Sequence, residues 1–269
     1  MRPEMALHDL KAMNNYLRTV LKDGENITFS EKVVPTLSEM IKLMKSGDVD
    51  LVSETPMGMI ALEKNAHANI LIHEWKKGTA EYASLIIARA DSGITDVDGL
   101  VGRVIAFEDS GSTSGFLMPL AMLRKKGFKS TLLKNRSEKP PAGTIGYVFA
   151  THEINIASLV ARKLVDAGAI SDLNWNDPLE VPPGFKKRLK IIHASALVPR
   201  AAVVVSKHVS ADLKTDLFQQ FSQMHKSFAG REAMKTYHGV SLFTPITAEL
   251  EAQFAELREL HTFVKDEIQ

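Results

Sequence analysis

The chain has 269 residues, with 33 Lys and Arg against 32 Asp and Glu, no Cys, and 45% hydrophobic residues. A chain of this length forms one large domain or two small ones, and its core needs neither disulfides nor a structural metal. The balanced charge argues against a nucleic-acid-binding protein, and the composition excludes disorder, collagen and a zinc–cysteine module. No stretch reaches the roughly 18 apolar residues that span a bilayer, and the first residues lack the apolar core of a signal peptide.

Helices and short apolar strands alternate along the chain. Residues 5–22 carry apolar side chains at three- and four-residue spacing, which predicts an amphipathic helix. Thr36 and Glu39 form a capping box for a second helix, which ends at Gly47 and leads into a strand over 49–52. Further strands are expected over 69–72, 84–88, 103–107, 145–149, 190–193 and 201–205, and further helices over 116–126, 153–165, 210–228 and 247–264. This alternation predicts an α/β fold with mostly parallel sheets covered on both faces.

A loop of small and hydroxyl residues, 108–115, is the first candidate binding segment. It follows the strand 103–107 and contains Ser112, Thr113 and Ser114 where the next helix begins. The start of a helix leaves backbone N–H groups unpaired and carries a partial positive charge, which favours an anion. The alternative is an ordinary strand-to-helix loop capped by Ser and Thr. The segment is neither a G-x-S-x-G nucleophile elbow nor a phosphate-binding Walker loop.

Three other segments occupy comparable places. His152 begins a helix after the strand 145–149, and is either a capping or surface histidine or a donor facing a ligand. Tyr82 precedes the strand 84–88, as a partly buried aromatic or a ligand contact. Glu54 and Thr55 follow the strand 49–52 and precede Pro56, as a plain cap or as ligand contacts. Ligands of open α/β sheets bind beyond the carboxyl ends of strands, so we expect these segments to form one site.

Five segments follow one another in a recognisable order: GDVDLVSETPM (47–57), VDGLVGRVIAFEDSGSTSGFLMP (97–119), GYVFATHEIN (146–155), VDAGAISDLNW (165–175) and VPRAAVVVS (198–206). The most specific feature is the Ser-Thr-Ser-Gly turn that leads into a helix. Together the segments resemble the PhnD-like family of phosphate-, phosphite- and phosphonate-binding proteins of ABC transporters. The resemblance covers about residues 5–245.

The resemblance implies a two-lobed periplasmic-binding-protein type II fold, with mixed, mostly parallel sheets and two crossing hinge strands near 85–89 and 201–206. Lobe one would comprise residues 1–87 and 204–269, and lobe two residues 88–203, with the ligand cleft between them. A small oxyanion would be captured by hinge closure and passed to an ABC-transporter permease. We expect a monomer without catalytic activity, metal or cofactor, and no nucleic-acid partner.

The family's site residues carry over to several positions of this chain. The Ser-Thr-Ser turn that holds phosphonate oxygens matches Ser112, Thr113 and Ser114; an aromatic at the first crossing matches Tyr82, and a histidine matches His152. Acidic contacts in the second lobe point to the region of Asp166 and Asp172. Where family members carry an aromatic in lobe one, this chain has Glu54 and Thr55. A carboxylate there would repel a phosphonate dianion but suit a ligand ammonium.

The start of the chain also departs from the family, whose members have a signal peptide or lipobox and then an apolar strand before the first helix. Here the helix begins almost at Met1. We therefore expect Met1 to lie inside a longer natural chain, with an apolar strand of about five residues upstream. The mature protein would be periplasmic, or anchored outside the cytoplasm. A ligand-sensing module of a signalling receptor is the main alternative, and an enzyme on the same fold is less favoured because no nucleophile–base or carboxylate pair is visible.

Overall fold

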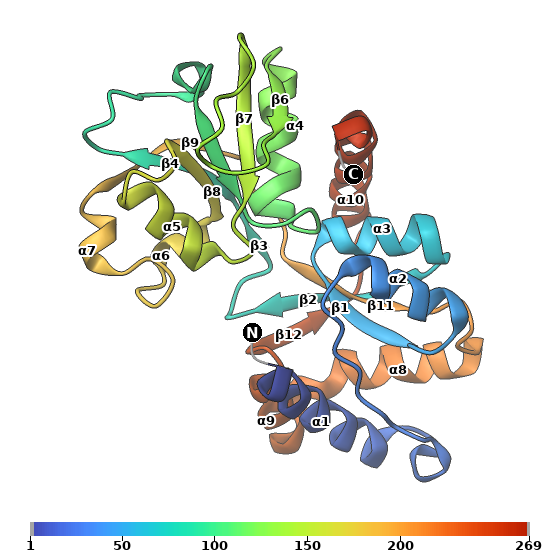
Figure 1. The fold of residues 1–269 in the computed structure, drawn as a ribbon. Helices are drawn as coiled ribbons and strands as arrows, with labels where there is room; N and C mark the ends of the chain where they lie inside the picture. The colour runs from blue at the N-terminus through green and yellow to red at the C-terminus, as the bar shows by residue number, and fades with distance from the viewer. Residues whose placement is uncertain (1–2, 268–269) are drawn as a thin grey trace. The chain divides into compact units, whose positions relative to one another are not determined.

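The computed structural model describes residues 3–267, which form two compact units (Figure 1). Unit 1 consists of residues 3–81 and 199–254, and unit 2 of residues 82–198 and 255–267. The chain therefore passes between the units at 81–82, 198–199 and 254–255. At the first two passages the short strands β3 (Glu81–Tyr82) and β10 (Val198–Pro199) pair in a two-stranded sheet.

The sequence predicted lobe boundaries at 87–88 and 203–204. In the structure the first two passages between the units lie a few residues earlier, at 81–82 and 198–199. The expected crossing segments are both strands: the first belongs to the sheet of unit 2 and the second to the sheet of unit 1. The end of the chain, expected in lobe one, contacts unit 2 from residue 255 onward. The Arg124 guanidinium stacks 4.8 Å from the centre of the Phe263 ring, a cation–π contact that holds this segment.

Unit 1 is built on a four-stranded sheet with the order β1-β11-β2-β12. Its strands are β1 (Leu51–Glu54), β2 (Asn69–Lys76), β11 (Ala201–Val205) and β12 (Val240–Thr244). All three strand pairs are antiparallel, so the expectation of mostly parallel pairing is wrong for this sheet. β1 and β2 run in the same direction, but β11 returns from unit 2 and lies between them.

Five helices belong to this unit, and the apolar faces of three of them, α1, α8 and α9, form a core with β2, β11 and β12. The helices are α1 (Pro3–Val20), α2 (Leu37–Ser46), α3 (Pro56–Ala66), α8 (Ala211–Gln223) and α9 (Phe228–Thr236). The capping box is confirmed: the Thr36 side chain accepts the Glu39 N–H at 3.2 Å, and Gly47 ends α2 with a φ of 85°. The helix expected over 210–228 ends early, because Ser227 caps a new helix through the Gly230 N–H.

Unit 2 is built on a six-stranded mixed sheet with the order β6-β7-β5-β8-β4-β9. Its strands are β4 (Ser84–Arg89), β5 (Val104–Phe107), β6 (Lys129–Leu132), β7 (Thr144–Phe149), β8 (Ala167–Ser171) and β9 (Leu189–Ala194). β6, β7, β5 and β8 are parallel, whereas β4 runs antiparallel to β8 and β9. The expected α/β class with mixed sheets is confirmed. β6 and β8 were missed because they are short and carry small or polar residues, and β12 was missed as well.

The helices of unit 2 follow its strands. They are α4 (Met118–Lys125), α5 (Glu153–Ala161), α6 (Asp172–Asn176), α7 (Pro183–Lys186) and the second half of α10 (Ala248–Phe263). α5 packs on β8 and β4 in a core of Ile, Val and Ala side chains. None of the helices within residues 3–267 is long and apolar enough to cross a membrane.

The contact between α5 and β8 requires glycine at position 168. A Cβ there would collide with Cγ2 of Ile156 and approach Cγ2 of Val160 to 3.2 Å. We predict that Gly168→Ala lowers the free energy of unfolding by about 1–3 kcal/mol, because the overpacked helix must shift. Denaturant unfolding measures this change. Gly184→Ala is the matched control, since a Cβ there meets nothing within 4 Å; equal losses in both variants would contradict the packing argument.

Candidate functional site

One edge of the six-stranded sheet collects most of the candidate residues. β5, β7 and β8 end at this edge, and the antiparallel strand β4 begins there, with Ser84 directly opposite Ser171. The loop 108–112, the start of α5 and the start of α6 therefore lie along the same edge. This is the geometry in which α/β sheets bind ligands.

The Ser112–Ser114 turn sits where β5 leads into the next helix. The helix begins with one π-helical turn, Thr113–Leu117, in which the Leu117 N–H donates to the Ser112 carbonyl at 3.0 Å. Ser112 caps this turn: its hydroxyl accepts the Gly115 N–H at 2.9 Å. The Ser84 hydroxyl of β4 donates to the Ser114 carbonyl at 2.5 Å. All three hydroxyl residues of the turn are buried, and π-turns are frequent at functional sites.

Aromatic side chains fix the turn from the side of the sheet. The Phe116 ring packs edge-on against Phe107 at 5.5 Å and against Phe149 at 5.2 Å, and Tyr147 completes the cluster. Such edge-to-face pairs stabilise by about 0.5–1.5 kcal/mol beyond the area they bury. The backbone of the turn is thus held by hydrogen bonds on one side and by aromatic packing on the other.

Glu108 places a carboxylate beside this turn. A Cβ added to Gly115 would lie 2.8 Å from the Glu108 Cβ and 3.2 Å from its Oε2, so the Glu108 side chain lies against Gly115. A negative charge at the start of a helix is favourable. Sequence analysis did not single out Glu108, although it is the first residue after β5, and that position was the available signal.

His152 lies next to this turn along the sheet edge. The preceding Thr151 N–H donates to the Glu108 carbonyl at 2.8 Å, which ties the start of α5 to the loop after β5. His152 itself is the exposed N-terminal cap residue of α5, with extended backbone. The structure therefore brings His152 and the Ser112–Ser114 turn to adjacent strand ends.

Asp172 joins β8 to the strand that enters unit 2. Its Oδ1 accepts the Ala83 N–H and the Leu173 N–H, both at 2.9 Å, and its own N–H donates to the Ala83 carbonyl. Tyr82, directly before Ala83, is 2% exposed. One oxygen of Asp172 thus positions the backbone beside Tyr82. Asp166, by contrast, bonds Arg103 and the Val104 N–H at the opposite edge of the sheet.

Glu153 is a second carboxylate that sequence analysis did not single out. Its Oε1 accepts the Ser171 N–H at 2.9 Å, at the end of β8, and the Ser171 hydroxyl donates to Asn174. Glu153 stands beside His152 in the sequence, yet it serves to connect α5 to β8. Its contact depends on long-range pairing that no local pattern encodes.

In unit 1, Glu54 is the last residue of β1, and Thr55 lies between β1 and α3. The Glu54 side chain lies against Gly58 in the first turn of α3, because a Cβ on Gly58 would collide with the Glu54 carboxylate. Thr55 is the cap residue, and its carbonyl accepts the Met59 N–H at 2.9 Å. Glu54 therefore occupies the positive end of α3, as Glu108 does at the turn of unit 2.

A buried ion pair lies beside the end of β1. The Lys76 ammonium is 3.1 Å from the fully buried Glu74 carboxylate and donates to the Ser53 hydroxyl at 2.9 Å. Burial raises the pKa of the nearby Tyr237, and the charge of Glu74 raises it further. This cluster belongs to the sheet of unit 1. No group of three or more His, Asp or Glu side chains within residues 3–267 is arranged to hold a metal ion.

Comparisons with known proteins agree on one family. The sequence profile of the family described as "ABC transporter, phosphonate, periplasmic substrate-binding protein" matches residues 2–250. The phosphate-import protein PhnD of Mycolicibacterium smegmatis is 26% identical over 225 residues, covering 80% of this chain and 67% of that protein. The phosphonates-binding periplasmic protein of Escherichia coli is 27% identical over 190 residues, covering 69% of this chain and 52% of its own length.

The chain thus spans about two thirds and about half of these two relatives. Among solved structures, XAC2383 of Xanthomonas citri superimposes with a TM-score of 0.94 at 27% identity, covering 98% of this chain and 95% of that chain. XAC2383 has been solved bound to chloride ion and bound to ATP.

The Ser112 cap gives a test of how the turn is held. We predict that Ser112→Ala lowers the free energy of unfolding by about 0.5–2 kcal/mol, because the Gly115 N–H loses its acceptor. Ser110→Ala is the matched control, since Ser110 is an exposed residue of the same loop. Thermal unfolding of both variants measures the difference, and a Ser112→Ala curve that overlays the Ser110→Ala curve would show that the cap does not hold the turn.

Proposed function

Because this chain belongs to the family of periplasmic substrate-binding proteins of phosphonate ABC transporters, we propose that it captures a small oxyanion of the phosphonate, phosphite or phosphate class for uptake. Its family consists of substrate-binding proteins without enzymatic activity. In this proposal the protein works outside the cytoplasm and delivers its ligand to a membrane permease. Hinge closure of the two units around the ligand would commit the complex to delivery.

The Ser112–Ser114 turn is the observation that carries this proposal. An oxyanion needs several converging donors, and the start of a helix supplies backbone N–H groups together with a partial positive charge. Hydroxyl groups of Thr113 and Ser114 would add donors. Because Ser112 and Ser84 already hold the backbone of the turn, little conformational entropy would be lost on binding.

The two helix-start carboxylates bear on which oxyanion is bound. Glu108 lies at the turn in unit 2 and Glu54 at the start of α3 in unit 1. A carboxylate near a phosphonate dianion is repulsive, whereas the same carboxylate attracts a ligand ammonium. We therefore favour a phosphonate that also carries an amino group, such as 2-aminoethylphosphonate, over methylphosphonate or inorganic phosphate.

A thermal-shift panel of phosphate, phosphite, methylphosphonate and 2-aminoethylphosphonate tests the ligand class. A bound ligand at 100 times its Kd stabilises the folded protein by about 2.7 kcal/mol, which corresponds to a shift of several degrees. We expect the largest shift with 2-aminoethylphosphonate. In Thr113→Ala the affinity should fall by about 1–3 kcal/mol, the cost of a hydrogen bond lost to a charged group. No shift with any of the four compounds would refute the proposed ligand class.

Glu108 supplies a second test. Glu108→Gln removes a negative charge beside the turn, so we predict that methylphosphonate binds more tightly, by on the order of tenfold. Asp109→Asn is the matched control, because Asp109 is exposed and accepts the Gly111 N–H through Oδ1, which asparagine retains. Calorimetric titration measures both variants. Equal affinity in Glu108→Gln, Asp109→Asn and the parent chain would place the Glu108 charge away from the ligand.

A further inference from the structure

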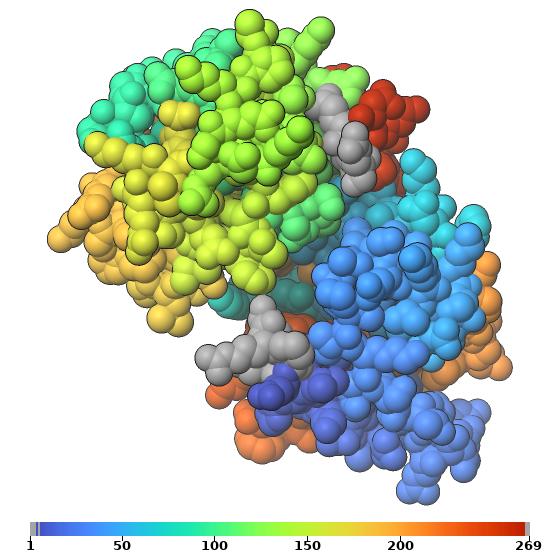
Figure 2. All heavy atoms as spheres, viewed as in Figure 1, coloured from blue at the N-terminus to red at the C-terminus, as the bar shows by residue number. Residues whose placement is uncertain are grey.

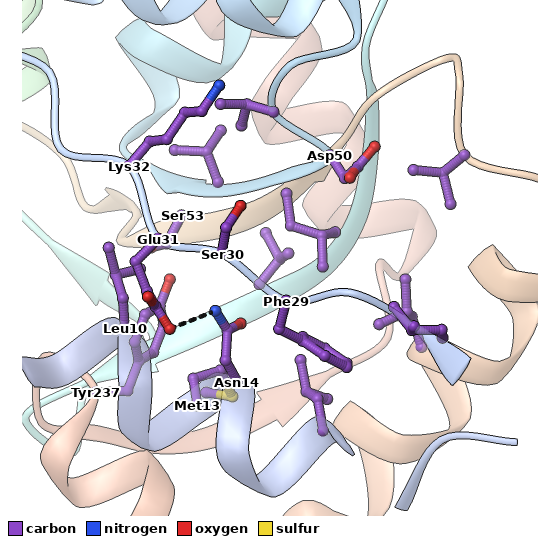
Figure 3. A pocket seen from close by; sticks show the side chains of 18 of the residues that line it. Leu10, Met13, Asn14, Phe29, Ser30, Glu31, Lys32, Asp50, Ser53 and Tyr237 are labelled. Carbon is purple, nitrogen blue, oxygen red and sulfur yellow. Dashed lines mark hydrogen bonds between the residues drawn. The ribbon is translucent and has the colours of Figure 1, made fainter. Parts of the chain in front are cut away.

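Unit 1 contains an apolar groove of about 500 Å³ between α1, the segment 27–34 and β1 (Figure 3). Leu10, Met13 and Phe29 contribute to its lining. None of the candidate site residues within residues 3–267 lines this groove, so it adds nothing to the proposed oxyanion site. Unit 2, in contrast, exposes apolar side chains at the same sheet edge that carries the Ser112–Ser114 turn.

Phe149 is the last residue of β7 and lies at this edge. It is 38% exposed, whereas Phe107, its partner in the parallel register of β5 and β7, is fully buried. The difference follows from the length of β6. This strand pairs with β7 only as far as Leu132 and Tyr147, so the last two residues of β7 extend past it. The Phe149 ring therefore keeps one open side.

The covered side of the Phe149 ring rests on the turn that follows β5. Its centre lies 5.2 Å from that of Phe116 and 5.6 Å from that of Tyr147, and both contacts are edge-on. Phe116 belongs to the same π-helical turn as Thr113 and Ser114 and is 1% exposed. The open ring is thus one side chain away from the turn whose backbone N–H groups begin the helix.

A second exposed apolar side chain lies along this edge. Ile154, in the first turn of α5, is 43% exposed, and the side chains of α5 lie at the surface of unit 2 in Figure 2, in yellow-green. The start of α5 is tied to the loop after β5, because the Thr151 N–H donates to the Glu108 carbonyl. The edge therefore presents apolar surface close to donors for an anion, a combination typical of small-molecule sites.

The chemistry of the oxyanion decides what meets this apolar surface. An oxyanion held by the turn directs its oxygens to the N–H and hydroxyl donors. The fourth substituent of its phosphorus atom then points away from them: carbon in a phosphonate, hydrogen in phosphite, oxygen in phosphate. A carbon chain gains free energy by covering an aromatic ring. A phosphate oxygen in the same place would lose hydrogen bonds to water that the ring cannot replace.

We propose that Phe149 is a specificity-determining residue, which packs against the organic substituent of an oxyanion bound at the Ser112–Ser114 turn. This inference rests on the proposed function and narrows it, because it selects phosphonates with a carbon chain over phosphate and phosphite. Ile154 adds apolar surface beside the ring. 2-Aminoethylphosphonate, which has two carbons ahead of its ammonium, suits both the Phe149 ring and the Glu108 carboxylate.

Calorimetric titration with phosphite, methylphosphonate, ethylphosphonate and propylphosphonate tests this proposal. In the parent chain we expect the affinity to rise with chain length, by up to about fourfold for each added carbon. Phe149→Ala should reduce the rise to less than about twofold for each carbon, whereas Phe149→Leu, which keeps an apolar side chain, should retain it. Phe228→Ala is the matched control, because Phe228 is exposed but belongs to α9 of unit 1.

Equal rises in the parent chain and in Phe149→Ala would overturn the proposal and leave the proposed function intact. This comparison needs a folded variant, which thermal unfolding establishes. A flat series in the parent chain would also overturn the proposal, and that result needs no variant. If none of the four compounds binds, the proposal is overturned as well. The proposed ligand class is then decided separately by 2-aminoethylphosphonate in the thermal-shift panel.

Discussion

Two hydroxyl groups hold the backbone of the Ser112–Ser114 turn, and the candidate site depends on them. The Ser112 hydroxyl accepts the Gly115 N–H, and the Ser84 hydroxyl, on the strand that enters unit 2, donates to the Ser114 carbonyl. With these bonds made, the donors of the turn are fixed before any ligand arrives. Under the proposed function, affinity would then depend on the charges around the turn, and the Glu108 side chain lies against it.

Sequence patterns predicted the elements whose signals are local. Thr36, Glu39 and Gly47 delimit α2 as expected, because capping depends on three or four neighbouring residues. The direction of β11 was not predictable in this way, since antiparallel pairing follows from the return of the chain out of unit 2. Glu108 and Glu153 were likewise missed because their contacts, with Gly115 and Ser171, depend on how strands and helices pack.

The two units share one local arrangement at the start of a helix, although their sheets differ. In each, a glutamate at the end of a strand or directly after it lies against a glycine in the first turn of the following helix: Glu54 with Gly58, and Glu108 with Gly115. The glycines permit this approach because they lack a Cβ. The sheets behind these helices differ. The six-stranded sheet is mixed and its strands alternate with helices, whereas all pairs of the four-stranded sheet are antiparallel.

Backbone amide chemical shifts test the central claim, oxyanion binding at the Ser112–Ser114 turn, most directly. The titrant is whichever of the four oxyanions gives the largest thermal shift, and the assigned ¹H–¹⁵N spectrum is followed to saturation. We predict that the amides of Thr113, Ser114 and Gly115 shift most, together with that of His152 at the neighbouring strand end. A saturable titration whose shifts lie elsewhere and leave Thr113–Gly115 unmoved would contradict it.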